Sequence, residues 1–158
     1  MPLHPAWAKN ITRRVLAATI SPDPSRRDRE QVEAYFGSRC AYCATDLPKK
    51  WHLDHLVPFD QGGSNHISNR VPACPTCNEQ EKRETPWDEF LREKCAADLA
   101  AYQTRRAQIE AWAAVRSAEA GAKISPELRA AWEREVALVG GAIDRAHQRL
   151  KAVRAMTS

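Results

Sequence analysis

The chain has 158 residues, which is the length of a single domain, and its formal net charge of +4 is only mildly basic. This charge permits an interaction with nucleic acid but does not demand one. No apolar run approaches the roughly 20 residues that a membrane-spanning helix needs, and no secretory apolar stretch lies near the first residues. The composition therefore excludes a membrane-embedded protein and predicts a cytoplasmic one.

Residues 1–38 are predicted to form an N-terminal helical extension. Apolar residues recur every four positions between residues 7 and 20, which predicts one helix. Ser25 is suited to the N-cap of a second helix, and Asp28 stands three residues later in the reciprocal position of a capping box. Gly37 is a natural residue to end that helix.

Four of the five cysteines form two Cys-x-x-Cys pairs, Cys40 with Cys43 and Cys74 with Cys77. Two spaced thiol pairs are a typical ligand set for a tetrahedral zinc ion, because each pair makes a tight knuckle that supplies two thiolates. Metal-bound thiolates indicate a reducing compartment rather than disulfide formation. We therefore predict a structural Zn²⁺ ion here. Cys95 lies on an apolar helical stripe and is predicted to be a core residue.

The residues between the two pairs predict a strand, a turn and a second strand, with a helix after them. Alternation of bulky and polar side chains indicates the first strand, and a proline ends it. Paired glycines favour the turn. The expected elements are a strand over 51–57, a turn over 61–64, a second strand over 70–73 and a helix from Thr76, as N-cap, to about Arg83.

The stretch from residue 39 to residue 86 resembles the HNH endonucleases, the β-β-α-metal nucleases built on a treble-clef-like zinc scaffold. The resemblance rests on an Asp-His pair, a glycine turn, a middle asparagine and a Cys-x-x-Cys-Asn run followed by a lysine, all in order. The third family position is an asparagine in place of a histidine, an HNN-type variant that keeps an oxygen ligand. The matching residues are Asp54, His55, Gly62, Gly63, Asn69, Cys74, Cys77, Asn78 and Lys82.

The chemistry of phosphodiester hydrolysis assigns roles to three of these residues. The reaction needs an activated water, neutralisation of the charge that grows on the phosphoryl group, and assistance to the leaving oxygen. His55 is the nearby side chain whose ordinary pKa lies near neutrality, so we predict that it is the general base. Asp54 and Asn78 each offer an oxygen, which suits one catalytic Mg²⁺ or Mn²⁺ ion better than a second zinc.

Three further residues complete the predicted site. The resemblance implies that Asn69 bonds near the base and holds its imidazole in place. Arg70 and Lys82 are candidates for contact with nucleic-acid phosphate.

The Asp-His pair raises a question of geometry. Neighbouring residues of a regular strand point to opposite faces, so Asp54 and His55 cannot both face one pocket from the middle of a strand. We therefore expect the pair at a strand end or a bulge, and Pro58 makes a strand end credible.

Residues 87–158 are predicted to form an antiparallel helical hairpin. Residues 88–118 contain no proline or glycine and favour one long helix. Ser125-Pro126 then has the N-cap and first-turn arrangement of a second helix, whose apolar seam runs from Leu128 to Val153. This seam is stronger than the stripe of the first helix. We therefore expect a homodimer or a protein partner on the hairpin, unless the N-terminal helices cover the seam.

These features predict an α+β, mostly α fold: a small zinc-stapled β-β-α-metal core with N-terminal helices and a C-terminal helical hairpin. The predicted segments are the extension over 1–38, the HNH nuclease module over 39–86 and the hairpin over 87–158.

The main functional prediction is a metal-dependent DNA endonuclease or nickase, and the resemblance implies 5′-phosphate and 3′-hydroxyl products. One alternative is a non-catalytic, zinc-stapled DNA-binding or adaptor module, although the intact Asp54, His55 and Asn78 argue against it. Another is a nuclease that cuts RNA, such as a toxin, because no feature of the sequence separates the two sugars.

Overall fold

The computed structural model describes residues 4–83, 85–119 and 121–157. The described chain is mostly helical and has one sheet of two strands, which confirms the predicted α+β, mostly α class. By its internal contacts it divides into two compact units. One unit comprises residues 23–124, and the other combines the residues up to 22 with those from 125 onward. Within the described residues, none of the helices combines the length and the apolar character that crossing a bilayer requires.

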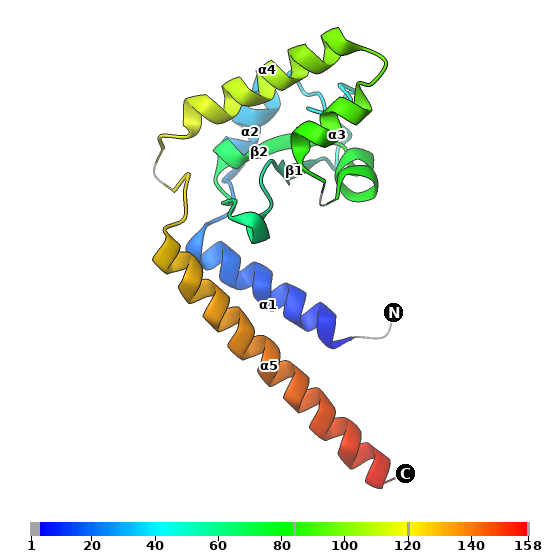
Figure 1. The fold of residues 1–158 in the computed structure, drawn as a ribbon, viewed down its shortest axis with the longest axis vertical. Helices are drawn as coiled ribbons and strands as arrows, with labels where there is room; N and C mark the ends of the chain where they lie inside the picture. The colour runs from blue at the N-terminus through cyan, green and yellow to red at the C-terminus, as the bar shows by residue number, and fades with distance from the viewer. Residues whose placement is uncertain (1–3, 84, 120, 158) are drawn as a thin grey trace. The chain divides into compact units, whose positions relative to one another are not determined.

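The second of these units is a pair of helices. Helix α1 (Pro5–Ile20) runs antiparallel beside helix α5 (Pro126–Met156), as Figure 1 shows. Ser125 caps α5 by accepting a hydrogen bond from the amide of Leu128, and Pro126 occupies the first turn, as the sequence predicts.

Trp132 is the centre of the contact between the two helices. Its side chain is buried, and the guanidinium of Arg13 lies 5.4 Å from its ring centroid. Further along, Lys9 forms an ion pair with Asp144 at 3.0 Å. The sequence predicts that the C-terminal helix packs on the helix before it, whereas in the structure α1 packs along it. An N-terminal helix thus covers the first part of the seam.

Helix α5 is almost twice as long as its partner, with 31 residues against 16. Its buried and half-buried positions end at Ile143, and residues 144–156 are all exposed. The final three turns of α5 therefore extend beyond its last half-buried position.

The unit over residues 23–124 begins with helix α2 (Arg26–Tyr35). Ser25 and Asp28 form the predicted capping box, in which each side chain accepts a hydrogen bond from the backbone amide of the other. Gly37 follows the helix with φ of +61°, which confirms its expected role at the helix end.

Both predicted strands are present: the first is shorter than the predicted 51–57, and the second has the predicted bounds. Strand β1 (His52–His55) pairs antiparallel with strand β2 (Arg70–Ala73), and the register sets His55 opposite Arg70. Between them lie two short 3-10 helices, η1 (Phe59–Gln61) and η2 (Ile67–Asn69).

The element after β2 is a π-helix, η3 (Thr76–Lys82). The predicted N-cap at Thr76 is wrong, because Pro75 occupies the cap position and no side chain caps the helix. The wider helical turn of η3 carries Cys77, Asn78 and Lys82, all of which the sequence analysis assigns to the site.

The single long helix predicted over 88–118 is wrong in one respect. Helix α3 (Trp87–Lys94) and helix α4 (Leu99–Arg116) are separate. Asp98 caps α4 by accepting a hydrogen bond from the amide of Ala101 at 2.9 Å, and this cap restarts the chain in a new direction. A stretch without proline or glycine can therefore still be divided into two helices by an N-capping residue such as Asp98.

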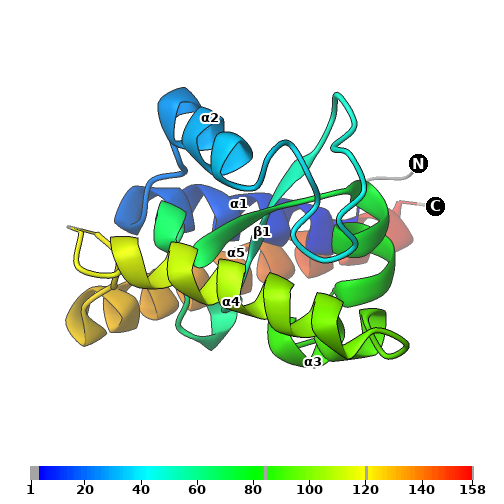
Figure 2. The ribbon, with the colours of Figure 1, turned by 90° about the horizontal axis from the view of Figure 1, so that it is seen from above.

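Helix α4 braces the strand pair. It packs on η2 and lies close to α3 (Figure 2). The indole nitrogen of Trp112 donates to the carbonyls of Ile67, at 3.1 Å, and Arg70, at 2.9 Å. Trp112 is buried, and Tyr35 and Phe36 pack against its ring. The backbone on both sides of Asn69 is thus fixed by a helix that follows it in the chain.

Candidate functional site

The four cysteines of the two pairs meet at one point. Their sulfur atoms all lie within 4.8 Å of one another, and Cys43 and Cys74 are 3.8 Å apart. Zn–S bonds of about 2.3 Å in a tetrahedron place sulfurs roughly 3.8 Å apart, so the donors present fit a zinc ion. Ala44, at φ of +58°, makes the tight turn after Cys43. The prediction that these cysteines can hold a metal is confirmed.

The thiols of this cluster also interact with each other. A hydrogen bond from Cys77 lowers the pKa of Cys40 to about 4, and the same bond raises the pKa of Cys77. Burial raises the pKa of Cys74. The fifth cysteine, Cys95, is buried in the core away from this cluster, as predicted.

Asp54 lies on the inward face of β1 with two partners. The hydroxyl of Tyr42 donates to its carboxylate at 2.6 Å, and the ammonium of Lys82 lies 3.1 Å from it. Burial raises the pKa of Asp54, while the nearby lysine opposes that shift. Burial also raises the pKa of Tyr42 well above its usual value. Tyr42 therefore stays protonated and donates its hydrogen.

Lys82, the predicted phosphate contact, lies inside the fold. Its side chain is 1% exposed and lies against Asp54, and its ammonium also donates to the carbonyl of His55 at 3.3 Å. A lysine in this position is an internal counter-ion that connects the two residues of the Asp-His pair.

His55 is the last residue of β1, as the geometry of the Asp-His pair required. Its Nδ1 lies 3.0 Å from a guanidinium nitrogen of Arg70, and its Nε2 lies 3.0 Å from the Oδ1 of Asn65. Since a guanidinium can only donate, Nδ1 accepts, and the ring proton sits on Nε2, where it bonds to Asn65. Burial and the Arg70 charge lower the pKa of His55 to about 4. The imidazole is therefore neutral at physiological pH.

Arg70 connects the strands through its guanidinium. Besides His55, it donates to the carbonyl of Leu53 at 3.1 Å and to Asn65 at 2.7 Å, and it lies 3.3 Å from Asp23. Burial lowers its pKa to about 10, so it remains charged. Its side chain is buried, so the structure places it against the predicted base rather than on the surface.

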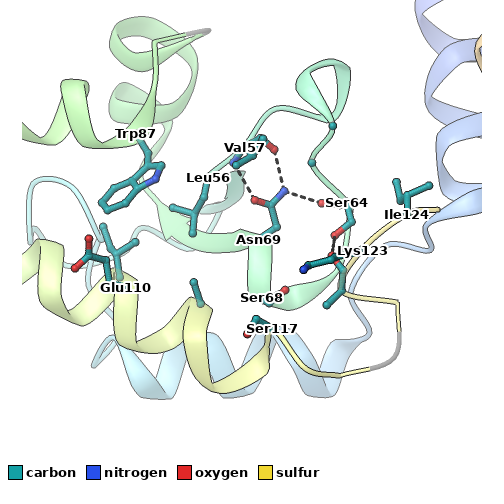
Figure 3. A pocket seen from close by; sticks show the side chains of 15 residues that line it. Leu56, Val57, Ser64, Ser68, Asn69, Trp87, Glu110, Ser117, Lys123 and Ile124 are labelled. Atoms are coloured by element: carbon teal, nitrogen blue, oxygen red, sulfur yellow. Dashed lines mark hydrogen bonds between the residues drawn. The ribbon is translucent and has the colours of Figure 1, made fainter. Parts of the chain in front are cut away.

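Asn69 closes the loop between the strands. Its side-chain oxygen accepts from the amide of Val57 at 2.9 Å, and its side-chain nitrogen donates to the carbonyls of Val57 and Ser64, at 2.8 and 2.9 Å (Figure 3). Its own carbonyl accepts from the amide of Leu56 at 2.9 Å. Asn69 thus fixes the backbone that directly follows His55, whereas Asn65 and Arg70 contact the ring.

Gly63 is required for this closed loop. A Cβ atom at this position would lie 1.9 Å from the carbonyl oxygen of Val57 and 2.7 Å from the side-chain nitrogen of Asn69. The predicted glycine turn therefore has a steric cause at Gly63, and at Gly62 a conformational one, because φ there is +97°.

Asn78 lies beside the first residue of β1, at the opposite end of the strand from His55. Its side-chain nitrogen is 2.9 Å from the Nδ1 of His52, and His52 is 3.5 Å from Glu79. Among the described residues, the four cysteines are the group of three or more His, Cys, Asp or Glu side chains that can hold a metal. Asp54 retains about two of its four acceptor positions after Tyr42 and Lys82 are counted. Its carboxylate and the Asn78 amide fit the oxygen chemistry of a hard divalent cation.

A pocket of about 610 Å³ opens on the other side of the Asn69 loop. Figure 3 shows Leu56, Val57, Trp87 and Asn69 around it. Neither His55 nor Asp54 is among its described lining residues, so this apolar hollow is distinct from the Asp-His pair.

Two residues that contact the Asp54-His55 pair were not predicted from the sequence. Tyr42 sits inside the first Cys-x-x-Cys motif, where the zinc spacing draws attention to its neighbours, and Asn65 follows the glycine turn. Both become visible only when the strands are paired, because their contacts are 12 and 10 residues away in the chain.

Comparison with known proteins gives matches over this region. A model of the family described as HNH endonuclease matches residues 40–84. A Bacillus subtilis (strain 168) protein, YoqL, named as an SPbeta prophage-derived HNH endonuclease, is 31% identical over 61 residues, or 31% of this chain and 25% of that protein. Anaredoxin of Nostoc sp. (strain PCC 7120) is 32% identical over 57 residues, or 36% of this chain and 74% of that protein. The chain thus spans a quarter of the first relative and about three quarters of the second.

The matched segment contains the site described above. It begins at Cys40 and includes the zinc-type cluster, the Asp54-His55 pair, the Asn69 loop and Lys82. Over residues 40–84 the chain therefore carries an HNH endonuclease domain.

Proposed function

We propose that this protein is a metal-dependent DNA endonuclease or nickase, with His55 as the general base. The observation that carries the proposal is the state of His55. Its ring is neutral, its orientation is fixed from both sides, and it sits at the strand end beside a carboxylate held by Lys82. A neutral, positioned imidazole is the form that can accept a proton from water.

Arg70 has a specific part in this proposal. In the structure its guanidinium occupies the Nδ1 lone pair that a general base needs. A phosphodiester anion beside Arg70 would attract the guanidinium, because bidentate pairing with phosphate is stronger than a bond to a neutral ring. Transfer of Arg70 to the substrate would free Nδ1, while Nε2–H keeps donating its hydrogen bond to Asn65 and holds the ring in place. This retains the predicted phosphate contact of Arg70.

The reaction then proceeds in line at phosphorus. His55 Nδ1 takes a proton from a water molecule as the water oxygen attacks the phosphorus atom. The bond between phosphorus and the 3′ oxygen breaks, and the leaving oxygen takes a proton from solvent water, so the products are a 3′-hydroxyl and a 5′-phosphate. Asp54 and Asn78 would hold one Mg²⁺ or Mn²⁺ ion, which supplies stabilisation of the negative charge on the leaving oxygen.

The four cysteines have a structural role in this proposal and take no part in the reaction. We propose that they bind one structural Zn²⁺ ion. It would join the knuckle of Cys40 and Cys43 to the start of η3, and so fix η3, with Asn78 and Lys82, against β1.

A nicking assay tests this function. Supercoiled plasmid is incubated with the purified protein and Mg²⁺, beside His55→Ala and a control, His4→Asn, which removes an exposed histidine that precedes α1. We expect relaxed or linear DNA with wild type and His4→Asn, and intact plasmid with His55→Ala. DNA binding without any cleavage by wild type would favour the adaptor alternative. Degradation of RNA alone, in a parallel digest, would favour the RNA-cleaving alternative.

A further inference from the structure

The net charge of the chain is concentrated in its last residues. All 20 acidic residues precede residue 145, and so do 20 of the 24 basic residues. The first 144 residues therefore have no formal net charge, and the whole excess of +4 lies within residues 145–158. Composition alone conceals this division, because it averages the excess over the whole chain.

The structure presents these charges on a helix that extends beyond its partner. We call residues 145–156 the C-terminal tip of α5; every residue in it is exposed. At about 1.5 Å per residue the tip is roughly 18 Å long. Its four cations follow the last ion pair between the helices, that of Lys9 with Asp144. They are Arg145, Arg149, Lys151 and Arg154.

The cations border a narrow apolar stripe. Arg145 and Arg149 are one helical turn apart and lie on one side of it, and Lys151 lies on the other. Leu150 and Val153 form the stripe itself and are 70% and 57% exposed. The aliphatic stems of arginine and lysine can cover such a stripe while their charged ends reach outward.

We propose that the tip binds the phosphate backbone of the nucleic acid that the HNH domain cuts. The inference rests on the proposed function for its substrate class. A cationic helix without acidic residues releases counterions when it meets a polyanion, and each neutralised phosphate adds to the affinity. The tip is a second contact surface, on a helix outside residues 40–84.

The charges and composition of the tip disfavour other occupants. A second copy of the tip in antiparallel contact would bring eight cations together with no carboxylate to offset them. A helix that lies on a membrane surface usually inserts several Trp, Phe and Leu side chains on its apolar face, whereas residues 145–156 contain no Trp or Phe and a single leucine, Leu150. Contact with a phosphate backbone, by comparison, requires only basic side chains spaced along a helix.

Binding measured without cleavage tests the proposal. The full-length His55→Ala protein is titrated against fluorescent 30-base-pair duplex DNA and against an RNA duplex of equal length, at several salt concentrations. The tip variant adds Arg149→Gln and Lys151→Gln. The matched control adds Arg14→Gln and Arg134→Gln, which remove two exposed cations from the same pair of helices and leave the same net charge.

We expect the tip variant to bind DNA roughly 10-fold more weakly near physiological salt, with a salt slope smaller by about 2. The control should bind within about 2-fold of its parent. Equal binding by the two variants would overturn the proposal. It would also be overturned if the tip variant lost self-association in light scattering, or binding to phosphatidylserine vesicles, while DNA binding stayed intact. If wild type binds through the tip but nicks no plasmid, the proposed function fails and the tip surface stands. Tighter binding of the RNA duplex than of the DNA duplex would identify RNA as the nucleic acid that the tip binds.

Discussion

The ammonium of Lys82 lies 3.1 Å from a carboxylate oxygen of Asp54, and the two side chains are 1% and 9% exposed. Removing one partner of such a buried pair leaves the other charge unpaired, at a cost of about 3–5 kcal/mol. We therefore expect Lys82→Met to lower the melting temperature of the unit over residues 23–124 strongly. Lys50→Met, at an exposed position, should change it little. Thermal unfolding by circular dichroism measures both.

The loss of stability caused by Lys82→Met should depend on pH. The pKa of Asp54 is already raised by burial, and loss of the lysine removes the charge that opposes this shift. In the variant, the folded state holds a proton that the unfolded state releases above pH 4. Its stability is therefore present at low pH and is lost as pH rises through the raised pKa. A deficit that is the same at pH 5 and pH 8 would show that Asp54 is not the group left unpaired.

Removal of the His55 imidazole should stop cleavage without weakening DNA binding. Loss of a general base typically costs 10²–10⁴-fold in rate. His55→Ala should lower the single-turnover rate by this factor, while its affinity for duplex DNA stays within about 2-fold of wild type. A His55→Ala protein that cleaves at the wild-type rate would remove His55 from the base role.

The pKa of His55 can be read directly. Burial and Arg70 lower it to about 4 in the folded protein, so NMR titration of the ring protons should find no protonation between pH 8 and 5.5. Because the unfolded chain binds this proton near pH 6.5, the contribution of His55 to stability falls as pH drops from 6.5 towards 4. Arg70→Met removes a positive neighbour, so its His55 should titrate at a higher pH. An unchanged midpoint would exclude the Arg70 contact as a cause.

Loss of one zinc-type cysteine should unfold the central module. Structural zinc contributes on the order of 10 kcal/mol in small metal-folded units. Cys40→Ser should therefore lose one bound zinc per chain and the cooperative melting of residues 23–124, while α1 and α5 retain partial helicity. Cys95→Ala, at the core cysteine, should keep its zinc. Elemental analysis with circular dichroism compares them. Zinc loss with unchanged melting would mean that the ion does not staple the fold.

Adding a single methyl group at Gly63 should open the loop behind the base. The new carbon would lie 1.9 Å from the carbonyl oxygen of Val57, and backbone cannot move aside as a flexible side chain does. Gly63→Ala should therefore lower activity by at least 10-fold and reduce stability by several kcal/mol. Gly37→Ala provides the comparison, since Gly37 has a positive φ but nothing within 4 Å. A fully active Gly63→Ala protein would argue that the Asn69 loop does not position His55.

The local signals in the sequence predicted much of this fold, because their causes are local. Capping by Ser25 and by Ser125 depends on neighbours within three residues, and the Cys-x-x-Cys spacing sets its own geometry. The break at Asp98 was also local, but the absence of proline and glycine concealed it. The partner of α5 could not be predicted in this way. Its seam specifies an apolar face, and only the folded chain shows that α1 supplies the cover.

The candidate site likewise has a part that was predictable from local sequence signals and a part that was not. The identities of Asp54, His55, Asn69 and Asn78 follow from motif order, whereas the contacts around them depend on strand register. Pairing His55 with Arg70 across the sheet brings the guanidinium to the imidazole, and no spacing in the sequence encodes that distance. Burial of Lys82 was equally hidden, because a lysine on a short helix is usually exposed.

The two hydrogen bonds of Trp112 bear on where this domain begins and ends. The indole satisfies the carbonyls of Ile67 and Arg70, yet it belongs to a helix that starts fifteen residues after the matched segment ends at residue 84. A peptide cut to residues 40–84 would leave both carbonyls without this donor and would expose the apolar groups that the indole covers. The smallest part of this chain that folds on its own around the site is therefore expected to be residues 23–124, more than twice the length of the segment that the family model matches.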